Sequence, residues 1–182
     1  MKAQGARAIA FDVLFLEPGD PEQDEIFRSA LQETGIVVLG ATVDQGDDPK
    51  FKRAQNVEPH EPFAAAAARV AEVNLPRDRD GVIRSTFLMP DGRPGLALAA
   101  YEVATGDNSY RAENSRLIDY YGPPRTVKTV SLYQALEPEQ FLPKDFFKDA
   151  VVFVGLSQAA AAGPAAKDAF LTPYRGAGGA AT

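Results

Sequence analysis

Asp12 is the residue whose type and position most clearly predict chemistry in this chain. It interrupts an apolar run over residues 7–16 that has the composition of a strand buried on both faces. Alternation along a strand places this carboxylate within or beside the core, where it is costly unless a partner holds it. The run supplies no such partner. We therefore expect backbone N–H groups, a basic side chain, a cation or a ligand to meet Asp12.

Asp168 offers a second carboxylate. Two carboxyl groups that face one substrate can act as acid and base in the hydrolysis of glycosides or phosphate esters. Sequence spacing alone does not establish that Asp12 and Asp168 meet. A small α/β hydrolase or phosphatase that uses them is one alternative for the function.

The segment Asp78–Gly81 has carboxylates on alternate residues before a glycine, as calcium-binding loops do. The full calcium loop would also need an oxygen ligand at position 76 and a glutamate at position 87, where this chain has Pro76 and Phe87. We therefore predict a tight turn, in which Asp80 accepts local N–H bonds and the glycine takes a positive φ. Arg84 is close enough in sequence to reach a carboxylate or an anionic ligand.

The residue types needed for several other chemistries are missing or misplaced. Ser157 follows an apolar run, but Ala159 breaks the nucleophile-elbow pattern, so Ser157 is predicted to cap a helix. His60 is the only histidine and falls in a polar stretch, which excludes a multi-histidine metal site. The chain has no cysteine and hence no disulfide or thiol nucleophile. We expect no cofactor, no metal and no catalytic residue.

Length and charge limit the remaining classes. The 182 residues are typical of one domain. The net charge of −6 arises from 25 acidic and 19 basic residues, and the basic ones are scattered, so we expect no nucleic-acid partner. The N-terminus lacks the apolar region of a signal peptide, and we predict no transmembrane helix within the chain.

The elements that must position these residues follow from the hydrophobic pattern. A strand, a helix that begins after Asp20 and a strand over 36–43 form a βαβ unit, with both strands parallel. We predict a single α/β domain with a central, mostly parallel sheet flanked by helices. The strands 7–16, 36–43 and 150–155 are expected at its buried middle, and 82–89 and 116–121 at an edge or antiparallel. Residues 44–60 are predicted to be a loop, and 62–73 a helix.

Several segments, in order, resemble the second class of CHASE domains, which are extracytoplasmic sensory domains of bacterial receptors. They are Ala8–Phe15 with Glu17 and Pro18, Asp24, Ile36–Leu39, Asp78–Arg84, Tyr120–Pro123, Val151–Ser157 and Asp168–Pro173. Together they span positions 7 to 173. The chain departs from the family before the last strand, where Lys148-Asp-Ala150 stands in place of a Gly-Lys pair.

The resemblance implies the extracytoplasmic (periplasmic) part of an inner-membrane signalling receptor. Residues 1–173 would form the sensor domain and 174–182 a flexible C-terminal linker. The implied partners are an unknown small-molecule or ion signal, the adjoining transmembrane helices, and a cytoplasmic output domain such as a nucleotide cyclase or histidine kinase. A homodimer is compatible with this role, and a ligand-free structural dimerisation domain is a further alternative. No enzymatic activity is implied.

The residues predicted to bind a ligand or to organise the fold share polar side chains in the segments that carry the resemblance or next to them. They are Asp12, Asp80, Arg84, Tyr121, Ser157, Asp168 and Thr172. In an α/β sheet Asp12 would lie beside the last buried strand if the two strands are neighbours. We predict that it ties the first strand to the C-terminal segment.

Overall fold

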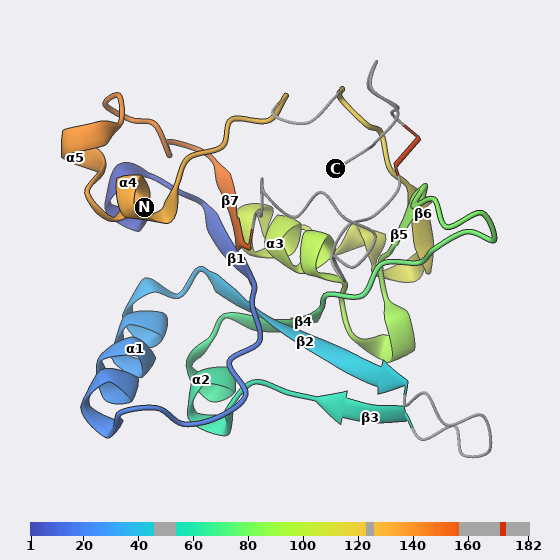
Figure 1. Ribbon diagram of the computed structural model, residues 1–182, viewed down its shortest axis with the longest axis horizontal. Coiled ribbons are helices and arrows are strands. Elements are labelled where there is room, and N and C mark those ends of the chain that lie inside the picture. Colours follow the sequence, from blue (N-terminus) through green and yellow to red (C-terminus); the bar gives the residue numbers. More distant parts are fainter. Residues whose placement is uncertain (46–53, 123–125, 157–171, 174–182) are drawn as a thin grey trace.

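The computed structural model describes residues 1–45, 54–122, 126–156 and 172–173, with a five-stranded sheet at its centre (Figure 1). Its strands are β1 (Ala8–Asp12), β2 (Val37–Gln45), β3 (Ala54–Val57), β4 (Arg69–Glu72) and β7 (Val151–Gly155). β7, β1, β2 and β4 are parallel neighbours in that order, and β3 runs antiparallel to the second half of β2. The predicted α/β fold with a mostly parallel central sheet is confirmed.

The other elements are short helices and one ribbon. The α-helices of the described residues are α1 (Pro21–Thr34), α2 (Glu61–Ala66), α3 (Leu96–Thr105), α4 (Leu132–Leu136) and α5 (Pro138–Phe141). Single 3₁₀ turns cover Lys2–Gln4, Pro90–Gly92 and Ser109–Ala112. β5 (Ser85–Phe87) and β6 (Ser115–Leu117) form an antiparallel ribbon, one of the two predicted arrangements, but both strands are shorter than predicted and lie outside the central sheet.

The βαβ unit forms because both ends of α1 are capped by the sequence. The Asp20 side chain accepts hydrogen bonds from the N–H groups of Glu22 and Gln23, at 3.1 Å each. Gly35 ends the helix in the left-handed region, with φ 63°, which favours glycine. The chain then enters β2, which pairs with β1 in parallel as predicted.

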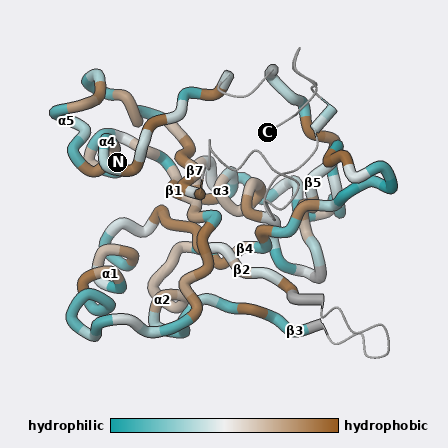
Figure 2. The backbone as a smooth tube through the Cα atoms, in the orientation of Figure 1, coloured by the Kyte–Doolittle hydropathy of each residue, from teal (hydrophilic) through white to brown (hydrophobic). Residues whose placement is uncertain are grey.

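Helices cover both faces of the sheet (Figures 1 and 2). On one face Ile9 and Leu39 pack with Leu31 of α1 and Phe63 of α2. On the other face the backbone of α3 approaches closely, because small side chains meet there. This second cluster consists of Ala10, Val38, Ala71, Ala99 and Ala100. The central strands are therefore buried from both sides, as their continuous apolar composition predicts.

The predicted helix over 62–73 is wrong in its second half. α2 ends at Ala66, Ala67 is extended, and residues 69–72 form β4. β4 pairs with β2 over four residues and buries Ala71 completely. This tertiary pairing outweighs the helix propensity of the alanines. The predicted loop 44–60 likewise contains β3, while residues 46–53 lie outside the described part of the chain.

The first strand is shorter than the predicted 7–16. It ends at Asp12, and Val13 and Leu14 are exposed. β1 pairs with β2 only as far as Phe11, so the chain leaves the sheet at this point. Phe15 nevertheless packs back onto the helical layer, with its ring centroid 5.0 Å from that of Phe27.

β7 lies at an end of the sheet rather than at its predicted buried middle. Among the described residues β7 pairs with β1 alone. Val152 and Val154 pack against the core on the α1 side, whereas Val151 and Phe153 point to the other face. They are 40% and 55% exposed, because α3 covers chiefly β1, β2 and β4.

Candidate functional site

Asp12 lies at the exposed end of β1. The prediction that it is in or beside the core is therefore wrong, because the strand ends there and the helices no longer cover it. Its expected neighbour is confirmed: Asp12 is the register partner of Gly155, at the end of β7. A Cβ atom at Gly155 would lie 3.4 Å from the Asp12 Cβ, an ordinary van der Waals contact, so the two positions are direct neighbours across the strands.

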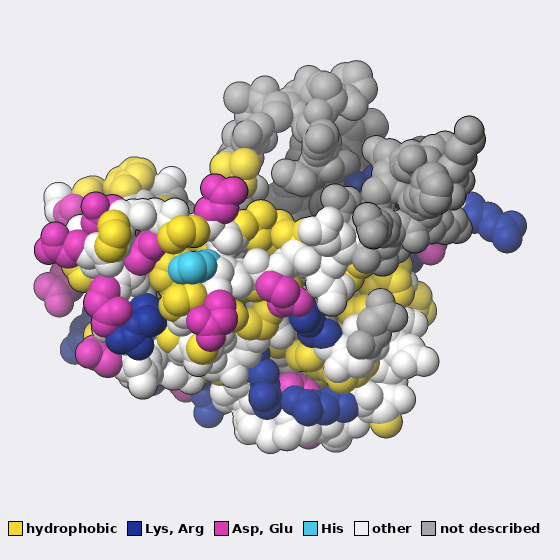
Figure 3. Space-filling model, turned by 90° about the horizontal axis from the view of Figure 1, so that it is seen from below, with side chains coloured by type: hydrophobic (Ala, Val, Ile, Leu, Met, Phe, Trp, Pro, Cys, Tyr) yellow, Lys and Arg dark blue, Asp and Glu magenta, His cyan; other side chains and the backbone are white. Residues whose placement is uncertain are grey.

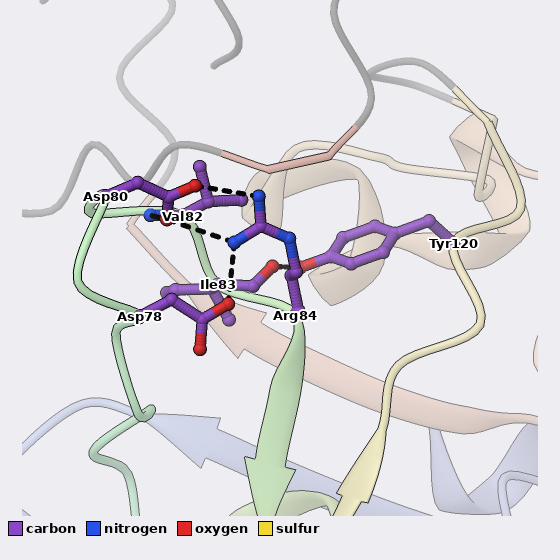
Figure 4. Close-up of polar contacts among 6 residues, drawn as sticks. All are labelled: Asp78, Asp80, Val82, Ile83, Arg84 and Tyr120. Carbon is purple, nitrogen blue, oxygen red and sulfur yellow. Dashed lines mark hydrogen bonds and ion pairs between the residues drawn. The ribbon is translucent and has the colours of Figure 1, made fainter.

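The segment from Asp78 to Arg84 forms a closed polar turn (Figure 4). Arg84 donates to both carboxylate oxygens of Asp80, at 3.0 and 2.8 Å, and to Asp78 at 2.6 Å. The Val82 N–H donates to Asp80 at 3.1 Å. Gly81 has φ 78°. The predicted tight turn is confirmed, and Arg84 reaches carboxylates of the same turn.

The electrostatics of this turn follow from these contacts. The hydrogen bonds from Arg84, and next the one from the Val82 N–H, lower the pKa of Asp80 from 3.8 to about 2. The same contacts with Asp80 and Asp78 raise the pKa of Arg84. Because the guanidinium already occupies both carboxylates, a cation would have to displace it. The role of these contacts is therefore to stabilise the conformation of the turn, and Arg84 provides most of them.

Tyr120 and Tyr121 differ sharply in their surroundings. The Tyr120 hydroxyl donates to the Ile83 carbonyl at 2.9 Å and so attaches the segment after β6 to the Arg84 turn (Figure 4). Burial raises the pKa of Tyr120. Tyr121, which the sequence prediction chose, is 86% exposed. The sequence did not distinguish which of two adjacent tyrosines faces the protein.

The remaining predicted site residues are only partly described. Ser157 and Asp168 lie outside the described residues. Thr172 is half-buried. The segment 172–173, red in Figure 1, is drawn beside the β5–β6 ribbon, and Figure 4 shows it next to the Arg84 turn. Figure 1 places the ends of β1 and β7 apart from that ribbon, so Asp12 is not brought to Asp80 and Arg84.

Glu102 is a buried charged residue that the sequence reasoning missed. Its side chain has no exposed surface, although it lies on the otherwise apolar helix α3. Arg111 donates to its two carboxylate oxygens at 2.6 and 2.7 Å, and Arg69 of β4 lies 3.7 Å from one of them. The contact with Glu102 raises the pKa of Arg111. A glutamate on the buried face of an alanine-rich helix was the signal that could have revealed this link.

A groove of about 510 Å³ runs along β7. Its walls come from the strand itself, from residues 127–130 and from the aromatic pair Phe146 and Phe147. The surface is mainly apolar, and Lys128 is the only side chain with a formal charge among the described residues that line it. The Lys128 Nζ lies 6.0 Å from the centre of the Phe146 ring. The volume is in the range of small-ligand sites.

The surface charges form no basic stripe on the face shown in Figure 3, where acidic and basic side chains are interleaved. His60, cyan in that figure, is half-buried although it falls in a polar stretch of the sequence. The backbone N–H of His60 donates to the Phe15 carbonyl at 2.6 Å, and the imidazole ring packs edge-on against Phe63. His60 is therefore part of the junction between β1 and α2.

Neither a metal-binding cluster nor a membrane-spanning helix is found among the described residues. No group of three or more histidine, cysteine, aspartate or glutamate side chains is arranged there to hold a metal ion. No helix in those ranges combines the length and the apolar character needed to cross a bilayer.

Comparison with known proteins gives one match. The family model described as the CHASE2 domain matches residues 1–181, essentially the whole chain. No curated protein and no solved structure matches the chain.

Proposed function

The chain belongs to the CHASE2 domain family, which comprises sensory domains of signalling receptors, and we propose that it is the extracytoplasmic input domain of a bacterial transmembrane receptor. The observation that carries the proposal is the length of the match, which spans residues 1–181. The partners in this proposal are a small-molecule or ion signal, flanking membrane helices and a cytoplasmic output domain. The output is a nucleotide cyclase, a histidine kinase or a related enzyme of the parent protein.

The strand order supports a mechanism in which the two ends of the domain move together. β1 and β7, the first and last strands of the described sheet, pair in parallel over five residues, from Ala8 with Val151 to Asp12 with Gly155. Sliding one strand past the other would break this ladder and reverse the faces of its side chains. A signal that acts on either strand therefore shifts both, and with them the segments that enter and leave the domain.

A non-enzymatic role fits the described residues better than hydrolysis. Asp12 is exposed at the end of a strand, beside Gly155 rather than beside a second carboxylate of the described sheet. Asp78 and Asp80, the carboxylates of the predicted turn, are engaged by Arg84. We accordingly assign Asp80 and Arg84 an organising role.

The location is tested in the full-length parent protein by cysteine labelling. This chain has no cysteine of its own, so a single introduced thiol gives an interpretable signal against the parent background. Leu117→Cys is suitable because Leu117 is 78% exposed. We expect a membrane-impermeant maleimide to label it in intact spheroplasts. Ala99→Cys, at a fully buried position, is the matched control and should react only after denaturation. Labelling of Leu117→Cys only after lysis would refute the extracytoplasmic location.

The sensory role is tested by ligand stabilisation of the domain. A ligand present at about 100 times its Kd stabilises the folded state by about 2.7 kcal/mol, which is about 5–11 °C in Tm for a domain of this size. A thermal-shift screen of metabolites and ions should give at least one such compound. Stabilisation by none would favour a ligand-free structural domain. Turnover of phosphate or glycoside substrates that Asp12→Asn abolishes without unfolding would establish the hydrolase instead.

A further inference from the structure

The outer edge of β7 presents a row of backbone hydrogen-bonding groups. The Arg7 N–H donates to the Ala150 carbonyl at 2.8 Å, so Ala150 faces β1. Successive residues of a strand alternate in direction, and the register of Ala10 with Phe153 likewise turns Val152 and Val154 toward β1. The N–H and C=O groups of Val151, Phe153 and Gly155 therefore point away from the sheet. No hydrogen bond joins them to another described residue.

This edge lacks the features that keep edge strands single. Natural edge strands are protected by charged side chains, proline or a bulge, whereas β7 reads Val-Val-Phe-Val-Gly and pairs with β1 without a bulge. The groove lies along the same edge and is mainly apolar, with Lys128 as the only charged side chain among the described residues that line it. An alkyl or aromatic ligand in this groove would leave the strand's N–H and C=O groups unpaired and desolvated, which is costly. An extended polypeptide satisfies them.

We propose that the edge of β7 pairs with β7 of a second copy of this chain, antiparallel and about a two-fold axis. With the axis at Phe153, each outward-facing residue meets an outward-facing residue: Phe153 meets Phe153 of the second copy, and Val151 meets Gly155. Residues that face each other in this way exchange both of their hydrogen bonds. The register therefore satisfies every outward N–H and C=O group from Val151 to Gly155, and the two sheets become one.

The side chains favour a second copy over an unrelated peptide. Val151 and Phe153 project from the same face of the strand and are 40% and 55% exposed. The two-fold brings two Phe153 rings together, which buries them against each other. No acidic side chain is present in the described lining of the groove that would select a basic partner. Identical edges are complementary to themselves, which is the condition for a closed dimer.

The far wall of the groove can make room for the incoming strand. Residues 127–130 form that wall, and no backbone hydrogen bond joins them to β7 or to any other described element. Thr129 bonds only locally, to the Val127 carbonyl at 3.1 Å. Displacing this segment outward therefore breaks no ladder. The interface stands independently of the sensory role proposed above.

Cysteine cross-linking tests the register directly, since the chain has no cysteine. Phe153→Cys places two thiols across the axis, where Cα atoms of a hydrogen-bonded pair are about 5.5 Å apart. Val151→Cys is the matched control on the same edge and face. Its Cα atoms would be about 14 Å apart, four residues out of register. With a bifunctional methanethiosulfonate of two-carbon spacer, we expect Phe153→Cys to cross-link at least 10-fold faster than Val151→Cys. Equal rates would refute the register.

The oligomeric state provides the second measurement. In sedimentation equilibrium of the chain, Phe153→Lys should weaken dimerisation at least 10-fold, because two lysines would face each other across the axis. Leu117→Lys, a charge added at an exposed leucine of the β5–β6 ribbon, should leave it unchanged. A chain that stays monomeric at high concentration while its Val151 and Phe153 amides resist hydrogen exchange would overturn the proposal, because another part of the same chain would then cover β7.

Discussion

Replacing Glu102 by glutamine tests whether a buried carboxylate holds α3 to its neighbours. Glu102 has no exposed side-chain surface and accepts two hydrogen bonds from Arg111, at 2.6 and 2.7 Å. Glutamine has nearly the same shape, so it leaves no cavity. The glutamine side chain retains one acceptor oxygen but turns its NH₂ group toward an N–H group of Arg111. The substitution therefore removes one charge-assisted hydrogen bond and places two donors against each other.

The expected cost follows from these contacts. A hydrogen bond to a charged group contributes about 1.5–3 kcal/mol. Breaking a fully buried ion pair costs about 3–5 kcal/mol, but Arg111 and Arg69 are partly exposed and recover water. We therefore expect Glu102→Gln to lower the free energy of unfolding by about 2–3 kcal/mol. For a domain of this size that corresponds to a fall in Tm of about 4–12 °C.

Urea unfolding followed by circular dichroism gives the measurement. Glu139→Gln on α5 is the control, because Glu139 is exposed and its loss should change stability by less than about 0.5 kcal/mol. In the double variant Glu102→Gln with Arg111→Gln, the two effects should be less than additive, since both remove the same bonds. A Glu102→Gln protein as stable as the Glu139→Gln control would refute the structural role of this carboxylate.

Three further substitutions test the turn, a close approach and a strained residue. The pKa of Asp80 is lowered to about 2, chiefly by Arg84, so the contribution of its carboxylate to folding stability is complete above the unfolded pKa of 3.8 and is lost as the pH falls toward 2. The difference in urea midpoint between the wild type and Asp80→Asn should therefore disappear over that pH interval. A difference that persists at pH 2 would contradict this account of the turn. Gly95→Ala would place a Cβ 2.4 Å from the Phe87 carbonyl oxygen and should destabilise the fold by about 1–3 kcal/mol in urea titrations. An unchanged urea midpoint would show that the backbone moves aside at no cost in stability. Asp149 has φ 57°, which strains a residue with a side chain, so Asp149→Gly should stabilise the folded state by about 0.5 kcal/mol. A fall in Tm would show that the contacts of the Asp149 side chain contribute more than the backbone strain costs.

The sequence predicted those parts of the fold in which local chemistry and global packing agree. The βαβ unit could be predicted because Asp20 caps the helix, Gly35 ends it and both strands are apolar. The turn at 78–84 could be predicted because Pro76 and Phe87 rule out a calcium loop, and the remaining residues have the composition of a tight turn. Arg84 pairs with the carboxylates of this turn.

The parts that failed depend on contacts distant in sequence. Residues 69–72 have a composition suited to a helix and become a strand because β2 offers a free edge. In the sequence Glu102 is an isolated charge on an apolar helix. The arginines that pair with it are Arg69, from strand β4, and Arg111, from a 3₁₀ turn nine residues further along the chain. The burial of Asp12 was inferred from alternation, which holds only while the strand continues.

β7 shows how the same limitation applies to the candidate interface. Its composition is that of a strand with neighbours on both sides, and it was predicted at the middle of the sheet for that reason. The described chain supplies one neighbour, β1, and leaves the other edge and Phe153 partly exposed. An exposed apolar edge strand without a protecting charge is a template on which another strand can pair. The composition of β7 thus agrees with the pairing that we propose, and the alternation along the strand turns Val151, Phe153 and Gly155 toward the edge that is unpaired in the described chain.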